Sequence, residues 1–350
     1  MPTFEGSQGI IANNCTFYDI AGNQIQNTVE SPPIAPPPPA FTAVFKRTLV
    51  LKHADFSPSF AVFTHDGGRI ISCCHDTPVI MIWDSTTGAI IKGPLTFAES
   101  PSSRQFVVLS QDGKRLLTGG GSFCAETASS WDIETSQSTV LTLGKHGGWA
   151  LSYDGTKLFT YAYFPTKNPT RVWDLVAGTC VSGETKPSGA SQSAFSRDGT
   201  KIITVDAHDG RLNIWDAETA DIMLGPYSHG HFGTVRSLSF SPDATVVALG
   251  LSTGKILLME CETGDILPAS ENFGGHTDWI SSLDFSPDGK WIVSASWDLT
   301  IRMWDAKTGF AVSRAFIGHQ DRVVSVVFSP DGKKVVSTSW DRTVRIWTLQ

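Results

Sequence analysis

The chain has 350 residues, of which 41% are hydrophobic and 17% charged, and its net charge is −7. This is the composition of a soluble globular protein, and the acidic balance argues against general nucleic-acid binding, which needs a basic surface. No apolar stretch approaches the roughly 18 residues that span a membrane, and the first residues do not form a signal peptide. The six cysteines follow no spacing framework, which favours a reducing compartment, the cytoplasm or the nucleus.

Residues 1–40 differ in composition from everything that follows. They are polar and rich in Asn and Gly, and they end in the segment SPPIAPPPPA. Consecutive prolines favour an extended polyproline II spacer, so a flexible polar leader with a Pro-rich linker is predicted. The spacing of Pro33 and Pro36 also matches a PxxP ligand, but a solvated linker is the favoured interpretation.

From residue 41 onward, an apolar run that ends in Trp-Asp or a related pair returns seven times, at intervals of 42 to 48 residues. The pairs are Trp83-Asp84, Trp131-Asp132, Trp173-Asp174, Trp215-Asp216, Met259-Glu260, Trp304-Asp305 and Trp347-Thr348. A period of this length indicates supersecondary units that bury their apolar faces only by stacking on their neighbours. A single domain over residues 41–350 is therefore predicted.

The last two repeats show most clearly what one unit contains. An apolar strand ends at Phe285 or Phe328, a Ser-Pro-Asp-Gly turn follows, and Gly289 or Gly332 supplies the positive φ of a tight hairpin. Two further strands follow, the second of them ending at the tryptophan, and a fourth strand comes after the Trp-Asp pair. Four short antiparallel strands per repeat predict an all-β propeller with one blade per repeat.

These motifs resemble those of the WD40 family over residues 41–350: the Trp-Asp pairs, the turns, and a histidine nine residues before the phenylalanine, as at His276 and His319. The resemblance implies a seven-bladed β-propeller. The seventh unit ends without room for a fourth strand, so the strand-like segment 41–53 is predicted to complete the last blade and to close the ring. The leader resembles, more weakly, segments of fungal NACHT/WD40 signalling proteins, although the chain contains no P-loop.

The resemblance also implies a buried structural network in each well-formed blade, made by the histidine, a strand Ser or Thr, an aspartate and the tryptophan. In blades six and seven its members are His276, Asp298, Trp304, His319, Asp341 and Trp347. The serine is open between Ser294 and Ser296 in one blade and between Ser337 and Ser339 in the other. Hydrolases also use a Ser-His-Asp trio, but its recurrence at the blade period favours a structural role.

No catalytic, metal or cofactor site is predicted. Cys73 and Cys74 are adjacent on a strand and face opposite sides, so they cannot easily share a metal ion with His75. An enzyme site in the channel needs carboxylates or histidines outside the blade networks, and His75 and His208 are the candidates for it.

The resemblance implies that a protein or peptide partner binds the top face of the propeller. Two positions per blade face it: the residue before the network aspartate and the residue four before the phenylalanine. The residues predicted on this face are His75, His208, Trp297, Trp340, Arg236, Ser281 and Val324, with Trp279 in a loop beside them. Trp297 and Trp340 stand out, because a solvated turn gains nothing from tryptophan and interfaces are enriched in Trp and Arg. The alternative is that these rings only pack against blade edges.

The predicted function is that of a non-enzymatic interaction scaffold or sensor, a monomeric propeller within a complex, with no cofactor, nucleic-acid or membrane partner. A second interpretation is a substrate-recognition or scaffold subunit of a signalling, ubiquitin-ligase or chromatin complex. A propeller enzyme with a site in the channel is the third.

Overall fold

The structure is a computed structural model. The residues that it describes are 47–53, 57–74, 79–96, 105–110, 113–120, 125–133, 135, 138–146, 148–161, 170–181, 190–206, 210–228 and 233–349. The predicted leader over residues 1–40 lies outside them and stays a prediction.

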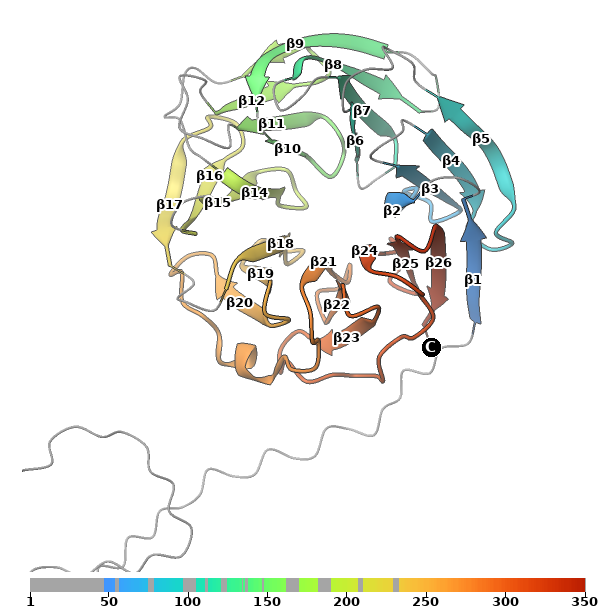
Figure 1. The fold of residues 1–350 in the computed structure, drawn as a ribbon. Coiled ribbons are helices and arrows are strands. Elements are labelled where there is room, and N and C mark those ends of the chain that lie inside the picture. Colours follow the sequence, from blue (N-terminus) through green and yellow to red (C-terminus); the bar gives the residue numbers. More distant parts are fainter. Residues whose placement is uncertain are drawn as a thin grey trace, which may run out of the picture. The chain divides into compact units, whose positions relative to one another are not determined.

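Seven antiparallel sheets follow one another around a ring in the described part of the chain, one for each repeat (Figure 1). Blade one contains β2 (Pro58–Phe63), β3 (Arg69–Cys74), β4 (Val79–Asp84) and β5 (Ile90–Thr96). Blade two contains β6 (Gln105–Leu109), β7 (Arg115–Gly120), β8 (Ala125–Asp132) and β9 (Ser138–His146). Blade three contains β10 (Gly148–Leu151), β11 (Lys157–Tyr161), β12 (Arg171–Asp174) and β13 (Thr179–Cys180).

The second half of the ring repeats the same order. Blade four contains β14 (Ala190–Phe195), β15 (Lys201–Asp206), β16 (Leu212–Asp216) and β17 (Ile222–Tyr227). Blade five contains β18 (Val235–Phe240), β19 (Val246–Leu251) and β20 (Ile256–Glu260), and blade six contains β21 (Ile280–Phe285), β22 (Trp291–Ser296) and β23 (Ile301–Asp305). Blade seven contains β24 (Val323–Phe328), β25 (Lys334–Ser339), β26 (Thr343–Thr348) and β1 (Arg47–Lys52).

The prediction that an N-terminal strand closes the ring is confirmed for the described residues. β1 pairs antiparallel with β26 from Arg47 opposite Thr348 to Lys52 opposite Thr343. The two strands therefore lie side by side, although almost 300 residues of chain separate them (Figure 1). Closure pairs the outer edge of β26, which would otherwise expose unpaired backbone N–H and C=O groups.

Blades five and six differ from the predicted four strands. Their sheets have three strands, and the outer position is filled by irregular chain that makes single bridges, such as Met259 to Ile266 and Trp304 to Ala311. In blade five this chain includes the 3₁₀ helix η1 (Pro268–Asn272). Pro268 has no N–H to donate to a strand ladder, which is a physical reason for the strand to stop there.

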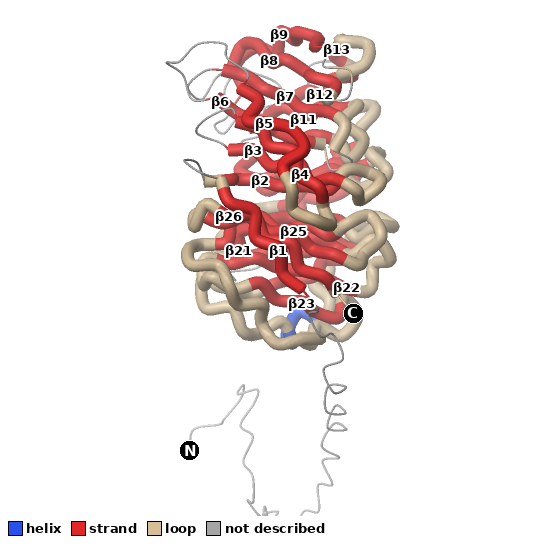
Figure 2. Tube along the Cα trace, turned by 90° about the vertical axis from the view of Figure 1, so that its right-hand side faces the viewer, coloured by secondary structure: helices blue, strands red, loops and turns tan. Residues whose placement is uncertain are grey.

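Apolar side chains hold the blades together in pairs. One cluster joins Val293 and Met303 of blade six to Val326, Phe328 and other residues of blade seven, and the other clusters described here join neighbouring blades in the same way. From the side, the strands form one band with loops on two opposite faces (Figure 2). The Ser-Pro-Asp-Gly turns lie on one face, here the bottom face, because they follow the inner strands. The loops that precede the inner strands lie on the other, the top face.

Candidate binding surface

A polar network joins four side chains across blade six. The Nε1–H of Trp304 donates to Ser294 Oγ at 2.8 Å, Ser294 Oγ lies 2.8 Å from His276 Nε2, and His276 Nδ1 lies 2.8 Å from Asp298 Oδ2. The serine left open by the sequence is thus Ser294. Ser296 instead donates from its hydroxyl to the carbonyl of Asp278 at 3.1 Å, and so holds the loop before β21.

Blade seven repeats this arrangement closely. The Nε1–H of Trp347 donates to Ser337 Oγ at 2.9 Å, and His319 lies 2.8 Å from both Ser337 Oγ and Asp341 Oδ2. The hydroxyl of Ser339 donates to the carbonyl of Asp321 at 2.8 Å, as the hydroxyl of Ser296 does in blade six.

The network is buried, and its polar groups are engaged with one another. Burial disfavours the charged carboxylate of Asp298, but hydrogen bonds from His276 and Thr300 and the charge of the His276 ring outweigh it and hold the pKa of that carboxyl well below its ordinary value. Burial lowers the pKa of His319, although Asp341 opposes that effect. The hydrogen bonds of each histidine ring to a serine and an aspartate engage every member of the network, which is what a structural core needs.

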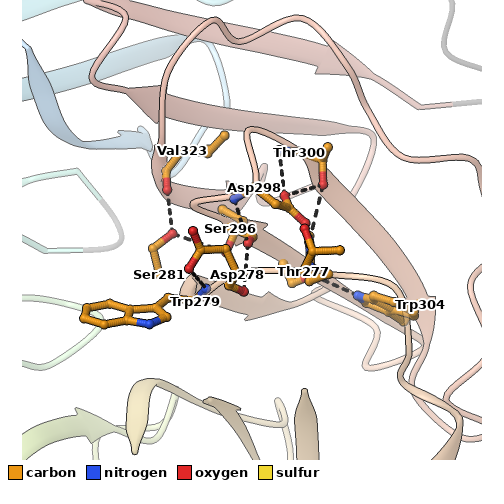
Figure 3. A network of polar contacts seen from close by, with 12 residues as sticks. Thr277, Asp278, Trp279, Ser281, Ser296, Asp298, Thr300, Trp304 and Val323 are labelled. Atoms are coloured by element: carbon orange, nitrogen blue, oxygen red, sulfur yellow. Dashed lines mark hydrogen bonds and ion pairs between the residues drawn. The ribbon is translucent and has the colours of Figure 1, made fainter. Parts of the chain in front are cut away.

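The network aspartate also fixes the top loops. Asp298 Oδ2 accepts the backbone N–H of Thr277 at 3.2 Å, and its Oδ1 accepts the N–H of Thr300 at 2.9 Å (Figure 3). The residue before Asp298 is Trp297, whose N–H donates to the carbonyl of Trp279 at 3.0 Å. Figure 3 shows the rings of Trp279 and Trp304 on opposite sides of this network. One turn therefore anchors the blade interior and presents Trp297 to the top face.

A β-bulge lies near the top of the inner strands of blades five, six and seven, at the positions predicted four residues before the phenylalanine. The register skips one residue between Val235 and Ser237, between Ile280 and Ser282, and between Val323 and Ser325. The extra residues are Arg236, Ser281 and Val324. A bulge re-aims the side chain of its unpaired residue, and here it sends Arg236 toward the next blade.

The side chains of Arg236, Trp279 and Trp297 form a continuous stack across blades five and six. The guanidinium carbon of Arg236 lies 3.9 Å from the ring centroid of Trp279. The Trp279 ring is stacked on that of Trp297, with centroids 4.4 Å apart and an angle of 21° between the planes. Such contacts between a cation and an indole face, and between indoles, stabilise an arrangement by roughly 0.5–1.5 kcal/mol each.

Arg322 extends this stack into blade seven. Its guanidinium carbon lies 4.2 Å from the ring of Trp297 and 5.2 Å from the ring of Trp340, and the two indoles lie 5.8 Å apart at 43°. Trp340 is 45% exposed, whereas Trp279, Trp297 and both arginines are partly buried. We call Arg236, Trp279, Trp297, Arg322 and Trp340 the arginine–tryptophan stack.

Sequence reasoning did not single out Arg322. The signal was available, because Arg322 occupies in the last repeat the position that Trp279 has in the one before: the motifs are His-Thr-Asp-Trp and His-Gln-Asp-Arg. The backbone carbonyls of the two residues also play the same part, since that of Arg322 accepts the N–H of Trp340 at 3.1 Å.

Ser281 and Val324, the other described residues that were predicted on the top face, take no part in the stack. The hydroxyl of Ser281 donates to the carbonyl of Val323 at 2.6 Å, so it ties blade six to blade seven. Val324 is partly buried on β24. His75 and His208 lie outside the described residues, so their predicted places near the channel stay predictions.

Within the channel, a cavity of about 270 Å³ is lined by residues of several inner strands and of the turns that follow them. Its polar lining includes Arg197, Tyr153, Ser193 and Asp284. The guanidinium of Arg197 lies over the ring of Tyr153 at 4.8 Å. In the described part of the chain, no three His, Cys, Asp or Glu side chains gather as a metal site, and no helix there is long and apolar enough to cross a membrane.

Fold and surface together define a β-propeller with an aromatic and cationic patch on one face. Residues 269–305 and 311–348 match the family model "WD domain, G-beta repeat". The two matched segments correspond to blades six and seven, so this β-propeller contains WD40 repeats. WD40 propellers serve in general as protein-interaction scaffolds.

Curated relatives match parts of the chain. It is 33% identical over 146 residues to human apoptotic protease-activating factor 1, which is 40% of this chain and 11% of that protein. It is 29% identical over 139 residues to WD repeat-containing protein SL1-17 of Schistosoma mansoni, 39% of this chain and 44% of that protein. The rat apoptotic protease-activating factor 1 matches 262 residues, 68% of this chain and 20% of that protein, at 26% identity. The chain thus spans less than half the length of these relatives.

Proposed function

We propose that this chain is a non-enzymatic interaction module that binds a protein or peptide partner on the top face of blades five to seven. The observation that carries the proposal is the arginine–tryptophan stack. Trp340 exposes 45% of its surface, and the ring of Trp297 is held between Trp279 and Arg322. Exposed indoles next to arginines are the side chains that most often dominate the binding energy of an interface.

Three further features support the proposal. The polar networks of blades six and seven give histidine, serine and aspartate a structural task in place of a catalytic one. Two of the relatives bear the name apoptotic protease-activating factor 1, and on this likeness we propose a signalling role for this chain as well. The described residues Cys73 and Cys261 are free thiols, which supports a cytoplasmic or nuclear location.

The test is affinity capture from native lysate with quantitative mass spectrometry, comparing the wild type with a Trp297→Ala/Trp340→Ala variant. A matched control, Val50→Ala/Ile90→Ala, removes apolar side chains that are 42% and 56% exposed on the outer strands β1 and β5. Thermal melts establish that each variant folds. We expect partners that are lost from the tryptophan variant and retained by the control. Identical partner sets for all three proteins would contradict the proposed surface.

A further inference from the structure

The arginine–tryptophan stack contains two guanidinium groups whose N–H groups can still donate to a partner from outside the described residues. The Nε atom of Arg236 is buried and has no hydrogen-bond partner among the described residues. None of the salt bridges in that part of the chain includes Arg236 or Arg322. The guanidinium groups of Arg236 and Arg322 lie against indole rings, at 3.9 Å from Trp279 and 4.2 Å from Trp297.

Contact with an indole face leaves a guanidinium ready to bind an anion. The five N–H donors of arginine lie in the plane of the group, so a ring that covers its face leaves the donors directed outward at the edge. This planar fork matches the two oxygens of a carboxylate, and hydrogen bonds between charged partners are about twice as strong as those between neutral groups.

The two aspartates that directly precede Trp279 and Arg322 are engaged in their own loops. Asp278 Oδ1 accepts the backbone N–H of Trp279 at 2.7 Å, and Asp321 Oδ1 accepts the N–H of Arg322 at 2.7 Å. Neither forms an ion pair with the arginines of the stack. The cationic edge of the stack is therefore not neutralised from within the described part of the molecule.

Building on the proposed function, we infer that the partner presents an acidic peptide segment to this surface. Two of its carboxylates pair with Arg236 and Arg322, and the apolar atoms between them lie on the exposed indole of Trp340 and along the rings of Trp279 and Trp297. The negative charge of the partner complements the two guanidinium groups, which form no ion pair with the described residues.

The geometry also predicts the spacing of the two carboxylates. The path from Arg236 across both indoles to Arg322 passes contacts of 3.9, 4.4 and 4.2 Å. An extended peptide advances about 3.3 Å per residue, so acidic residues about three to four positions apart reach both arginines at once. Adjacent acidic residues reach one arginine only.

The experiment selects binders from a displayed library of random 12-residue peptides against the full chain. The peptides recovered on the wild type are then tested on three variants: Trp297→Ala/Trp340→Ala, Arg236→Gln/Arg322→Gln, and the control Lys290→Gln/Lys333→Gln. The control removes the same charge from exposed turns of the opposite face. Thermal melts are recorded for all variants. Recovered peptides are synthesised with a fluorescent label, and their affinity is measured by anisotropy at low and high salt.

We expect the recovered peptides to be enriched in Asp and Glu with the predicted spacing. Their affinity should fall at least tenfold in the arginine variant, stay within twofold in the lysine control, and weaken as salt rises. Replacing their acidic residues by Gln or Asn should have the same effect as the arginine variant.

Three results would overturn the inference, and they can be told apart. Peptides that need the tryptophans but show no acidic enrichment would refute the acidic partner and leave the binding surface standing. A failure to recover any tryptophan-dependent peptide would count against both. A labelled single-stranded dT12 probe is run alongside, because exposed indoles also stack on bases. If dT12 binds more tightly than the peptides and needs the arginines, the partner is a nucleic acid and the inference is wrong.

Discussion

Replacing Asp284 by asparagine should stabilise the propeller at neutral pH. Asp284 lies on the inner strand β21 of blade six at the wall of the channel cavity. Its Oδ2 atom accepts the backbone N–H of Phe328 in blade seven at 2.9 Å. Burial raises the pKa of this carboxyl from 3.8 to about 6, although the Phe328 hydrogen bond and the charge of Arg197 oppose the rise. The amide oxygen of asparagine can accept the same hydrogen bond without carrying the buried charge.

The size of the stability change follows from the pKa values of Asp284 in the unfolded and folded states. Because the folded pKa is above the unfolded one, the folded state binds more protons between pH 3.8 and about 6, so stability falls as the pH rises through that range. The full interval corresponds to about 3 kcal/mol. Asp284 is partly exposed, and exposure to solvent weakens the effect of burial on a charge, so we expect a gain of about 1–2 kcal/mol for Asp284→Asn at pH 7.5.

Denaturant unfolding at pH 7.5 and pH 4 tests this reasoning. At pH 4 Asp284 is protonated in the folded state, so most of the cost of burying its charge is absent. Asp288 in the following turn is the control. Burial opposes its ionisation, but hydrogen bonds from Ser286 and from the N–H of Lys290 lower its pKa, so Asp288→Asn should lose stability at pH 7.5. A loss of stability in Asp284→Asn at pH 7.5, or an equal gain at both pH values, would refute the account.

Three further outcomes follow from the core. Ser294→Ala leaves the Trp304 indole N–H and His276 Nε2 without partners and should cost about 2–4 kcal/mol in urea unfolding; adding Trp304→Phe should recover part of that loss, and strictly additive losses would contradict the network. Burial lowers the pKa of His53 to about 4, so stability should fall as the pH drops from 6.5 to 4, and a His53→Gln variant with an unchanged pH profile would disprove this. Deleting β1 (Arg47–Lys52) should give aggregated protein by size-exclusion chromatography, and a soluble monomer with the wild-type melting curve would show that closure is dispensable.

The repeat made the architecture readable from the sequence. Trp-Asp pairs and Ser-Pro-Asp-Gly turns at a regular period are local sequence motifs. They can be recognised without any knowledge of the fold. The closure of the ring by β1 was also predictable, because counting strands leaves one strand missing at the end and one extra at the start. The absence of the outer strands of blades five and six was not predictable. Irregular chain takes the place of the fourth strand there, and the length of the sequence repeat stays the same.

The candidate surface was predictable only in part. Trp279, Trp297, Trp340 and Arg236 could be proposed from their positions in the repeat, but their order in space depends on bulges and on loop geometry. Arg322 occupies the repeat position of Trp279, but an arginine at that position does not by itself indicate a contact with indole rings. Its role depends on the distance to two indoles that are 25 and 18 residues away in sequence, and such a contact exists only in the folded ring.

The position of the stack over blades six and seven has a physical reason. In these two blades the network aspartate directly follows the top-face tryptophan, as in Trp297-Asp298 and Trp340-Asp341. Each aspartate is fixed by a buried histidine at 2.8 Å, so the backbone that carries each indole is held from below. A rigid loop loses little conformational freedom when a partner binds. The polar network that stabilises a blade therefore also preorganises the surface above it, and blade five, where Thr253 stands in place of the aspartate, contributes an arginine aimed by a β-bulge instead.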